Sequence, residues 1–374
     1  MHPLDYKGCI FNALREVECM NVVEQYNLTL QIEVLKEQSA ETLARLCKLV
    51  DKSGTSDYVE ALKAYSHMVN TELYLATSIH ELDVLKSDMI KLESTIKASL
   101  AQASHEVSDV KDVKANSDIP DIESYSCEDF DKALERTIDF LTFNKNISST
   151  PHAVILGGQS GAGKTTIHRV KMMEYKGDYI VIDGDTYRAQ HPHFRELQEK
   201  YGVDSVDYTK VFAGKMVEAV IDKLSSLKYN LIIEGTLRSA AVPIKTATLL
   251  KSKGYTVDFC LIATKPELSY LTTQLRYLEM MIVDPLQARA TPKDHHDGIV
   301  ESLVSNINEL EQSGLFESIQ VYKRDLEQIY NSKLCTESVG AVVDQILFGA
   351  WTQDESALLA VSKSQEQELK SKLP

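Results

Sequence analysis

The ten residues GGQSGAGKTT, from 157 to 166, combine four glycines with one lysine and two threonines. From Gly158 to Thr165 they match the pattern G-x-x-x-x-G-K-[ST] without a mismatch. Glycines let the backbone curl so that its N–H groups converge on phosphate oxygens, and the lysine and the threonine hydroxyl add contacts to phosphate and Mg²⁺. The stretch therefore predicts a phosphate-binding loop for a nucleoside triphosphate.

The segments on either side supply the context that this motif requires. AVIL, residues 153–156, is a short buried-strand pattern, and TTIHRVKMMEY after the loop has a helical one. We expect Lys164 to reach the β- and γ-phosphates and Thr165 to offer its hydroxyl to Mg²⁺. A chance glycine-rich turn is one alternative, and a dinucleotide site is another, although the loop does not read G-x-G-x-x-G. The residues expected to bind nucleotide are Gly158, Gln159, Ser160, Gly161, Ala162, Gly163, Lys164, Thr165 and Thr166.

Acidic and basic side chains downstream could complete a reaction. Asp183 and Asp185 follow the apolar run DYIVI, and Glu234 ends the run YNLIIEG. Ligands of open α/β sheets lie beyond the carboxyl ends of the strands, where one carboxylate can lie near a metal and another can take a proton from a substrate hydroxyl. Capping of a helix is the alternative for either aspartate. Arg276 and Arg289 are candidates to neutralise a transferring phosphate, or else solvated surface residues.

The pattern of apolar residues divides the chain into two regions. Short apolar runs ending in Gly, Asp or Thr (HAVILGG, DYIVIDGD, YNLIIEGT, TVDFCLIAT) alternate with helical patterns, which predicts a doubly wound, mainly parallel α/β domain over 122–374. Over 1–103, apolar residues recur at spacings of three and four, with a break at DKSGTSD (51–57). This predicts an all-α bundle of about three helices. Residues 104–121 are rich in Ser and Asp and predict a linker.

Composition argues against several classes of partner. The formal net charge of −15 disfavours nucleic acid. No run approaches the roughly 18 apolar residues of a membrane span, and the N-terminus does not resemble a signal peptide. The six cysteines are scattered, without a metal-ligand or disulfide spacing. We therefore expect a cytoplasmic protein with no nucleic-acid and no membrane partner.

Six segments in collinear order resemble the zeta toxin family, the UDP-N-acetylglucosamine kinases of epsilon/zeta-type toxin–antitoxin systems. They are GGQSGAGKT, IDGDTYRAQHPHF, FAGKMVEAV, NLIIEGTLR, VPIKTATLLKSKGY and QARATPKDHHD. The resemblance covers about residues 122–374 and implies a P-loop kinase. Such a kinase uses ATP or GTP and Mg²⁺ to phosphorylate the 3′-hydroxyl of the amino sugar, and thereby blocks cell-wall synthesis.

The resemblance also implies roles for individual residues. By position, Asp185 is the catalytic base, Lys164 keeps the role argued above, and Arg276 and Arg289 stabilise the phosphate. Spacing alone would not single out Glu218 or Thr246. The implied sugar-nucleotide contacts are Asp185, Glu218, Glu234, Thr236, Arg238, Thr246 and Arg289.

The chain departs from the family pattern in front of the kinase region. Family toxins begin close to that region, and family antitoxins are separate small helical bundles that block the nucleotide site. We therefore interpret 1–103 as an antitoxin-like bundle joined to its toxin and acting as an intramolecular inhibitor. The alternative is an oligomerisation or docking bundle. Two other functions stay open: a kinase of another sugar nucleotide or small hydroxyl compound, and a silent nucleotide-binding regulatory module.

Overall fold

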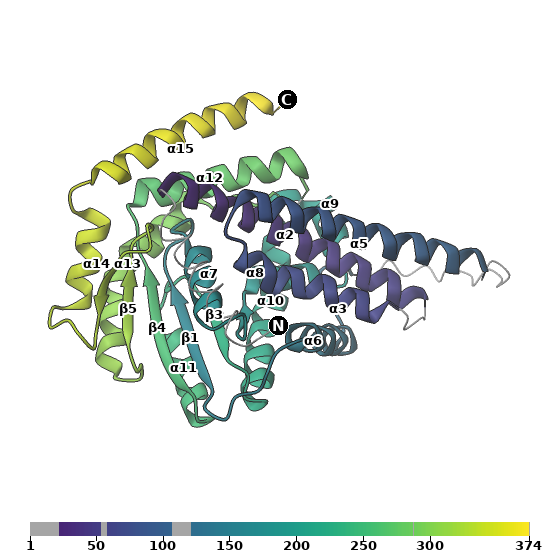
Figure 1. The fold of residues 1–374 in the computed structure, drawn as a ribbon, viewed down its shortest axis with the longest axis horizontal. Coiled ribbons are helices and arrows are strands. Elements are labelled where there is room, and N and C mark those ends of the chain that lie inside the picture. Colours follow the sequence, from purple (N-terminus) through teal and green to yellow (C-terminus); the bar gives the residue numbers. More distant parts are fainter. Residues whose placement is uncertain (1–21, 54–57, 107–120, 287, 374) are drawn as a thin grey trace, which may run out of the picture.

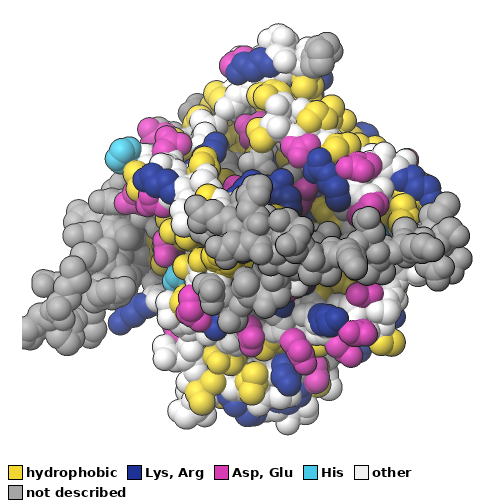
Figure 2. Space-filling model, turned by 90° about the vertical axis from the view of Figure 1, so that its right-hand side faces the viewer, with side chains coloured by type: hydrophobic (Ala, Val, Ile, Leu, Met, Phe, Trp, Pro, Cys, Tyr) yellow, Lys and Arg dark blue, Asp and Glu magenta, His cyan; other side chains and the backbone are white. Residues whose placement is uncertain are grey.

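The computed structural model describes residues 22–53, 58–106, 121–286 and 288–373. A sheet flanked by helices lies beside a bundle of long helices (Figure 1). No helix within these ranges is long and apolar enough to cross a membrane. On the face presented in Figure 2, acidic and basic side chains are interspersed rather than gathered by sign.

The sheet has six strands in the order β2-β3-β1-β4-β5-β6. The first five are parallel, and β6 runs antiparallel to β5. All four strands expected from the sequence are present. The sequence did not single out β5 and β6, because IQVY and QIYN have only four residues each and include polar ones. The strands are β1 (His152–Gly157), β2 (Ile180–Ile182), β3 (Leu231–Glu234), β4 (Thr256–Ile262), β5 (Ile319–Tyr322) and β6 (Gln328–Asn331).

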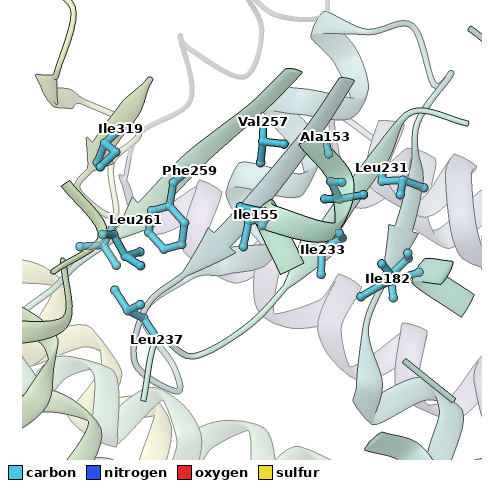
Figure 3. Close-up of a cluster of buried hydrophobic side chains, with 14 of the residues drawn as sticks. Ala153, Ile155, Ile182, Leu231, Ile233, Leu237, Val257, Phe259, Leu261 and Ile319 are labelled. Atoms are coloured by element: carbon cyan, nitrogen blue, oxygen red, sulfur yellow. The ribbon is translucent and has the colours of Figure 1, made fainter. Parts of the chain in front are cut away.

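Both faces of the sheet are covered, which explains the near-continuous apolar runs. On one face, side chains from neighbouring strands, among them Ile155, Ile233 and Phe259, pack together (Figure 3). Helices α6, α10, α11, α13 and α14 contribute to this core. On the other face, strand residues pack against Ile167 and Met172 of α7. The mainly parallel, doubly wound α/β fold is therefore confirmed.

The helices of the α/β part have the following bounds. They are α6 (Cys127–Thr142), α7 (Lys164–Glu174), α8 (Gly184–Tyr187), α9 (Phe194–Tyr201), α10 (Ser205–Ser226), α11 (Ala241–Ser252), α12 (Pro266–Val283), α13 (Lys293–Ser313), α14 (Val339–Phe348) and α15 (Gln353–Lys372). Short 3₁₀ turns, η2 (Arg188–Gln190) and η3 (Gly202–Asp204), connect α8, α9 and α10.

The bundle consists of α2 (Val22–Ser53), α3 (Val59–His67) and α5 (Ile79–Glu106). A π-helical segment, η1 (Met68–Glu72), and one further turn, α4 (Leu73–Leu75), extend α3. A bundle of about three helices is thus confirmed. Residues 104–106, which the sequence places in the linker, belong to α5. The rest of the predicted linker up to residue 120, and residues 54–57 of the predicted break, lie outside the described residues.

Helix α2 belongs to both parts of the molecule. One set of its apolar side chains, including Leu28 and Leu46, packs in the bundle core. Another set, Tyr26 and Leu30, packs against Leu268 and Leu275 of α12 and against α15. This second contact lays α2 across the carboxyl ends of the strands, where ligands of α/β sheets bind.

Candidate active site

The loop between β1 and α7 has the conformation of a phosphate cradle. Gly158, Gly161 and Gly163 have φ angles of 143°, 73° and 103°, which side chains rarely adopt. A Cβ on Gly158 would lie 2.4 Å from the carbonyl oxygen of Ile262, and one on Gly161 would lie 2.1 Å from that of Ser269. The loop therefore needs glycine at these positions, and α7 begins directly behind it at Lys164.

Lys164 lies inside the curl of the loop. Its Nζ donates to the Gly158 carbonyl at 3.2 Å and lies 3.7 Å from a carboxylate oxygen of Glu234, at the end of β3. The side chain is only 10% exposed. The ammonium group is thus directed at the space above the loop, as expected for a group that contacts phosphate.

The two aspartates after β2 take different positions. Asp183 caps the short helix α8 by accepting from the Asp185 backbone N–H at 3.0 Å, so the capping alternative holds for this residue. Burial opposes ionisation of Asp185, but Arg289 and Arg188 together hold its pKa well below the usual range. The Asp185 carboxylate is therefore ionised at neutral pH, as a proton acceptor must be.

Both candidate arginines lie in the site rather than on the solvated surface. Arg289 lies 3.5 Å from Asp185, and Arg276 extends from α12 into the same space. Both approach Glu37 of α2, at 2.8 Å from Arg289 and 3.7 Å from Arg276. Tertiary structure thus brings together the groups that spacing alone left uncertain.

Helix α2 contributes a charged cluster that the sequence interpretation missed. Glu33 accepts from the Thr165 hydroxyl at 2.8 Å and lies 3.7 Å from Arg276. Lys36 donates to Asp183 at 2.5 Å. With Glu37, these side chains share one helix face and leave a cavity of about 80 Å³ above the phosphate loop. The only signal in the sequence is a group of charges on one side of an apolar helix, which usually indicates a solvated face.

A second cavity, of about 400 Å³, opens beside the first. Four of the predicted sugar-nucleotide residues line it: Glu234, Thr236, Arg238 and Thr246. Glu234 and Thr236 line both cavities, so the two spaces adjoin. Glu218 does not line either cavity; it is exposed and accepts from Lys245 at 2.9 Å, and its role stays a prediction.

Glu234 is held in an unfavourable place for a charge. Burial and the neighbouring Asp183 raise its pKa to about 7, although Lys164 opposes the shift. Its second carboxylate oxygen lies 3.3 Å from Nε2 of His168 on α7. Burial and Lys36 lower the pKa of His168 to about 3, so this imidazole is neutral. Sequence reasoning missed His168, which has no motif of its own.

The stability of the protein should depend on pH through Glu234. Its pKa is higher in the folded than in the unfolded chain, so its destabilising effect grows as pH rises from about 4.5 towards 7. Glu234→Gln should therefore leave the free energy of unfolding nearly unchanged at pH 4.5 and raise it by roughly 3 kcal/mol at pH 8. Denaturant titrations at the two pH values measure this, with exposed Glu218→Gln as control. A gain of equal size at both values would contradict the prediction.

Two family models match separate regions of the chain. Residues 138–334 match the family model described as Zeta toxin. The chain belongs to the zeta toxin family. Residues 24–99 match the model described as Bacterial epsilon antitoxin, so the bundle of this zeta toxin chain is antitoxin-like.

Individual relatives match the same two regions of the zeta toxin chain. It is 56% identical to Toxin PezT of Streptococcus pneumoniae over 252 residues, covering 67% of this chain and 100% of that protein. It is 41% identical to Toxin zeta of Streptococcus pyogenes over 211 residues, 56% of this chain and 74% of that one. A 90-residue segment is 29% identical to Antitoxin PezA of Streptococcus pneumoniae, 22% of this chain and 57% of that one.

A solved structure from the PezAT chromosomal toxin–antitoxin system of Streptococcus pneumoniae is also similar. It shares 53% identity, covers 67% of this chain and 100% of its own, and has a TM-score of 0.63. The zeta toxin chain thus joins a toxin with a kinase-like fold to an antitoxin-like bundle.

Proposed function

We propose that the zeta toxin domain transfers a phosphoryl group from ATP or GTP to the 3′-hydroxyl of the amino sugar of UDP-N-acetylglucosamine, and thereby blocks cell-wall synthesis. The observation that supports this most is the pair of adjoining cavities. One lies over the phosphate loop and is lined by Asp185, and the other is large enough for part of a sugar nucleotide. A hydroxyl at their junction would lie between donor phosphate and base.

The residues present fit a nucleotide and Mg²⁺. Protein sites for Mg²⁺ usually supply one or two ligands and leave the rest to phosphates and water. The Thr165 hydroxyl at the start of α7, with Asp183 lining the same cavity, suits that mode. Among the described residues, no group of three or more His, Cys, Asp or Glu is arranged to hold a metal alone. When bound, Mg²⁺ would neutralise phosphate charge.

The chain's own side chains would perform the remaining steps. Asp185 would accept the proton of the attacking hydroxyl, because its carboxylate is ionised and lines the phosphate cavity. Lys164, Arg276 and Arg289 would neutralise charge on the transferring group. In the larger cavity, Thr236, Arg238 and Thr246 offer polar contacts, and apolar side chains such as Phe259 and Val242 would cover the less polar faces of the substrate.

We further propose that the bundle inhibits this reaction within the same chain. Glu33 and Glu37 engage the arginines and the Thr165 hydroxyl, and Lys36 engages Asp183. The remaining space of about 80 Å³ is far smaller than the roughly 300–1,000 Å³ of a small-molecule site. A nucleotide and α2 would therefore compete for the same groups. An oligomerisation role of the bundle remains the alternative.

Turnover of the domain that begins at residue 122 tests the function. With ATP, Mg²⁺ and UDP-N-acetylglucosamine, mass spectrometry should find a singly phosphorylated sugar nucleotide, and other UDP-sugars should react more slowly. Lys164→Ala should lower the rate by roughly 10²- to 10³-fold because the phosphates lose a fixed cation. Lys210→Ala, an exposed lysine on α10, is the matched control. Binding of ATP without any phosphorylated sugar would instead indicate the silent regulatory module.

A further inference from the structure

Arg324 lies beside the phosphate loop but has no role in the chemistry above. It follows β5 in the turn to β6, at the carboxyl end of the sheet. Its Nη1 donates to the Gly161 carbonyl of the phosphate loop at 2.8 Å. Its Cζ lies 4.6 Å from the centre of the Tyr26 ring of α2. Tyr26 is only 3% exposed, so the docked bundle covers this guanidinium with an aromatic ring.

We infer that Arg324 is the stacking surface for the purine base of the phosphoryl donor, and that the Tyr26 ring occupies the place of the base while α2 is docked. The inference rests on the proposed binding of ATP or GTP at the phosphate loop. Nucleotides of α/β sheets bind beyond the carboxyl ends of the strands, where Arg324 lies. A guanidinium stacks on a flat π-system whether that belongs to tyrosine or to a purine.

The surroundings of the Tyr26 ring suit a base. Leu268 of α12 and Leu358 of α15 pack in the same cluster as Tyr26, and both belong to the toxin domain. They also line a small cavity that includes Arg324. Departure of α2 would therefore expose the planar Arg324 cation between these two apolar side chains. The small cavity is also lined by the acidic residues Asp325, Asp354 and Glu355, which would disfavour a phosphate. A flat, uncharged ring fits there better than a phosphate does.

The order of contacts along α2 supports the same assignment. The Tyr26 ring packs against the Arg324 guanidinium. One turn further along α2, the Thr29 hydroxyl lies 3.1 Å from that of Thr166 at the start of α7. One turn beyond that, the Glu33 carboxylate accepts from the Thr165 hydroxyl. Spacings of three and four keep these side chains on one helix face. With a rise of about 1.5 Å per residue, the ring lies about 10 Å along the axis from Glu33. Along α2, an aromatic ring is therefore followed by a charged group, in the same spatial order as the base and the phosphates of a nucleotide.

Stacking recognises the face of a base and not its edge. Arg324 should therefore contribute equally to the binding of ATP and GTP and nothing to the binding of a triphosphate without a base. If Arg324 instead only supports the phosphate loop through the Gly161 carbonyl, its loss would alter the loop. The affinity for ATP, GTP and the triphosphate without a base would then fall by the same factor. This contrast separates the two roles of the side chain.

The test uses the full chain with Glu33→Gln and Glu37→Gln, which loosen α2, and measures binding by calorimetry. In this background Arg324→Ala should lower the affinity for ATP and for GTP about tenfold each. It should lower the affinity for inorganic tripolyphosphate less than twofold. Arg324→Lys, which keeps the charge but loses the plane, should behave like Arg324→Ala. Lys333→Ala, an exposed lysine just after β6, is the control and should change none of the three affinities.

Each other outcome has a distinct meaning. An equal loss of affinity for all three ligands, or an unchanged affinity for ATP, would show that Arg324 does not bind the base. The interpretation of the phosphate loop would be unaffected. If neither the background chain nor the domain that begins at residue 122 binds any of the three, the proposed function is overturned as well. A second arm does not depend on Arg324: in the otherwise unchanged chain, Tyr26→Ala should strengthen ATP binding severalfold and Tyr26→Phe should not. No effect of Tyr26→Ala would contradict the inference.

Discussion

Removal of residues 1–121 is expected to raise sugar phosphorylation by about 10²-fold when the ATP concentration is limiting. In the docked state, charged contacts from α2 engage Thr165, Asp183 and Arg289. Hydrogen bonds to charged groups contribute about 1.5–3 kcal/mol each. Two of them, about 3 kcal/mol together, correspond to a hundredfold ratio of closed to open molecules. Because the bundle is covalently attached, it stays at high effective concentration.

The measurement compares turnover per active site and ATP affinity for the full chain and for the shortened one. A full-length variant, Lys36→Met with Glu37→Gln, should give a smaller gain in the same direction, because only part of the α2 contact is lost. Glu60→Gln, an exposed residue of α3, is the control. Equal turnover and equal ATP affinity in the two chains would exclude inhibition in cis. A fall in mass by light scattering, without a gain in activity, would indicate an oligomerisation bundle.

Asp185→Asn in the shortened chain is expected to lower the rate of sugar phosphorylation by roughly 10²- to 10⁴-fold. An amide cannot accept the proton of the attacking hydroxyl, whereas the carboxylate, held ionised beside Arg289 and Arg188, can. ATP affinity should stay within about threefold, since the loop groups that would bind phosphate are unchanged.

Steady-state rates and calorimetry on the same preparation separate the two quantities. Asp207→Asn, an exposed residue of α10, provides the matched control. A variant that retains a third or more of the normal rate would show that Asp185 is not the base. Loss of ATP binding in parallel with the rate would instead show that the substitution acts on the nucleotide site.

Local segments of the chain determined the phosphate loop and the fold class. The strand, the glycine turn and the first turn of α7 are contiguous, so backbone conformation and helix start are specified by neighbours in the sequence. The strands β1 to β4 could be predicted from the sequence because both faces of the sheet are covered, which requires nearly continuous apolar residues. Strands β5 and β6 have only four residues each, and polar residues interrupt their apolar pattern, so the sequence did not single them out.

Only the tertiary structure decided which side chains meet at the site when α2 is docked on it. Glu33, Lys36 and Glu37 have a spacing that any solvated helix face could show, and only packing of α2 against α12 turns them towards Arg276 and Arg289. Likewise, nothing local marks Arg324 or His168, which acquire meaning from the loop and carboxylate beside them. Periodicity identifies which residues share a helix face, but the groups opposite that face come from distant parts of the chain. Their identity depends on docking, which sequence spacing does not encode.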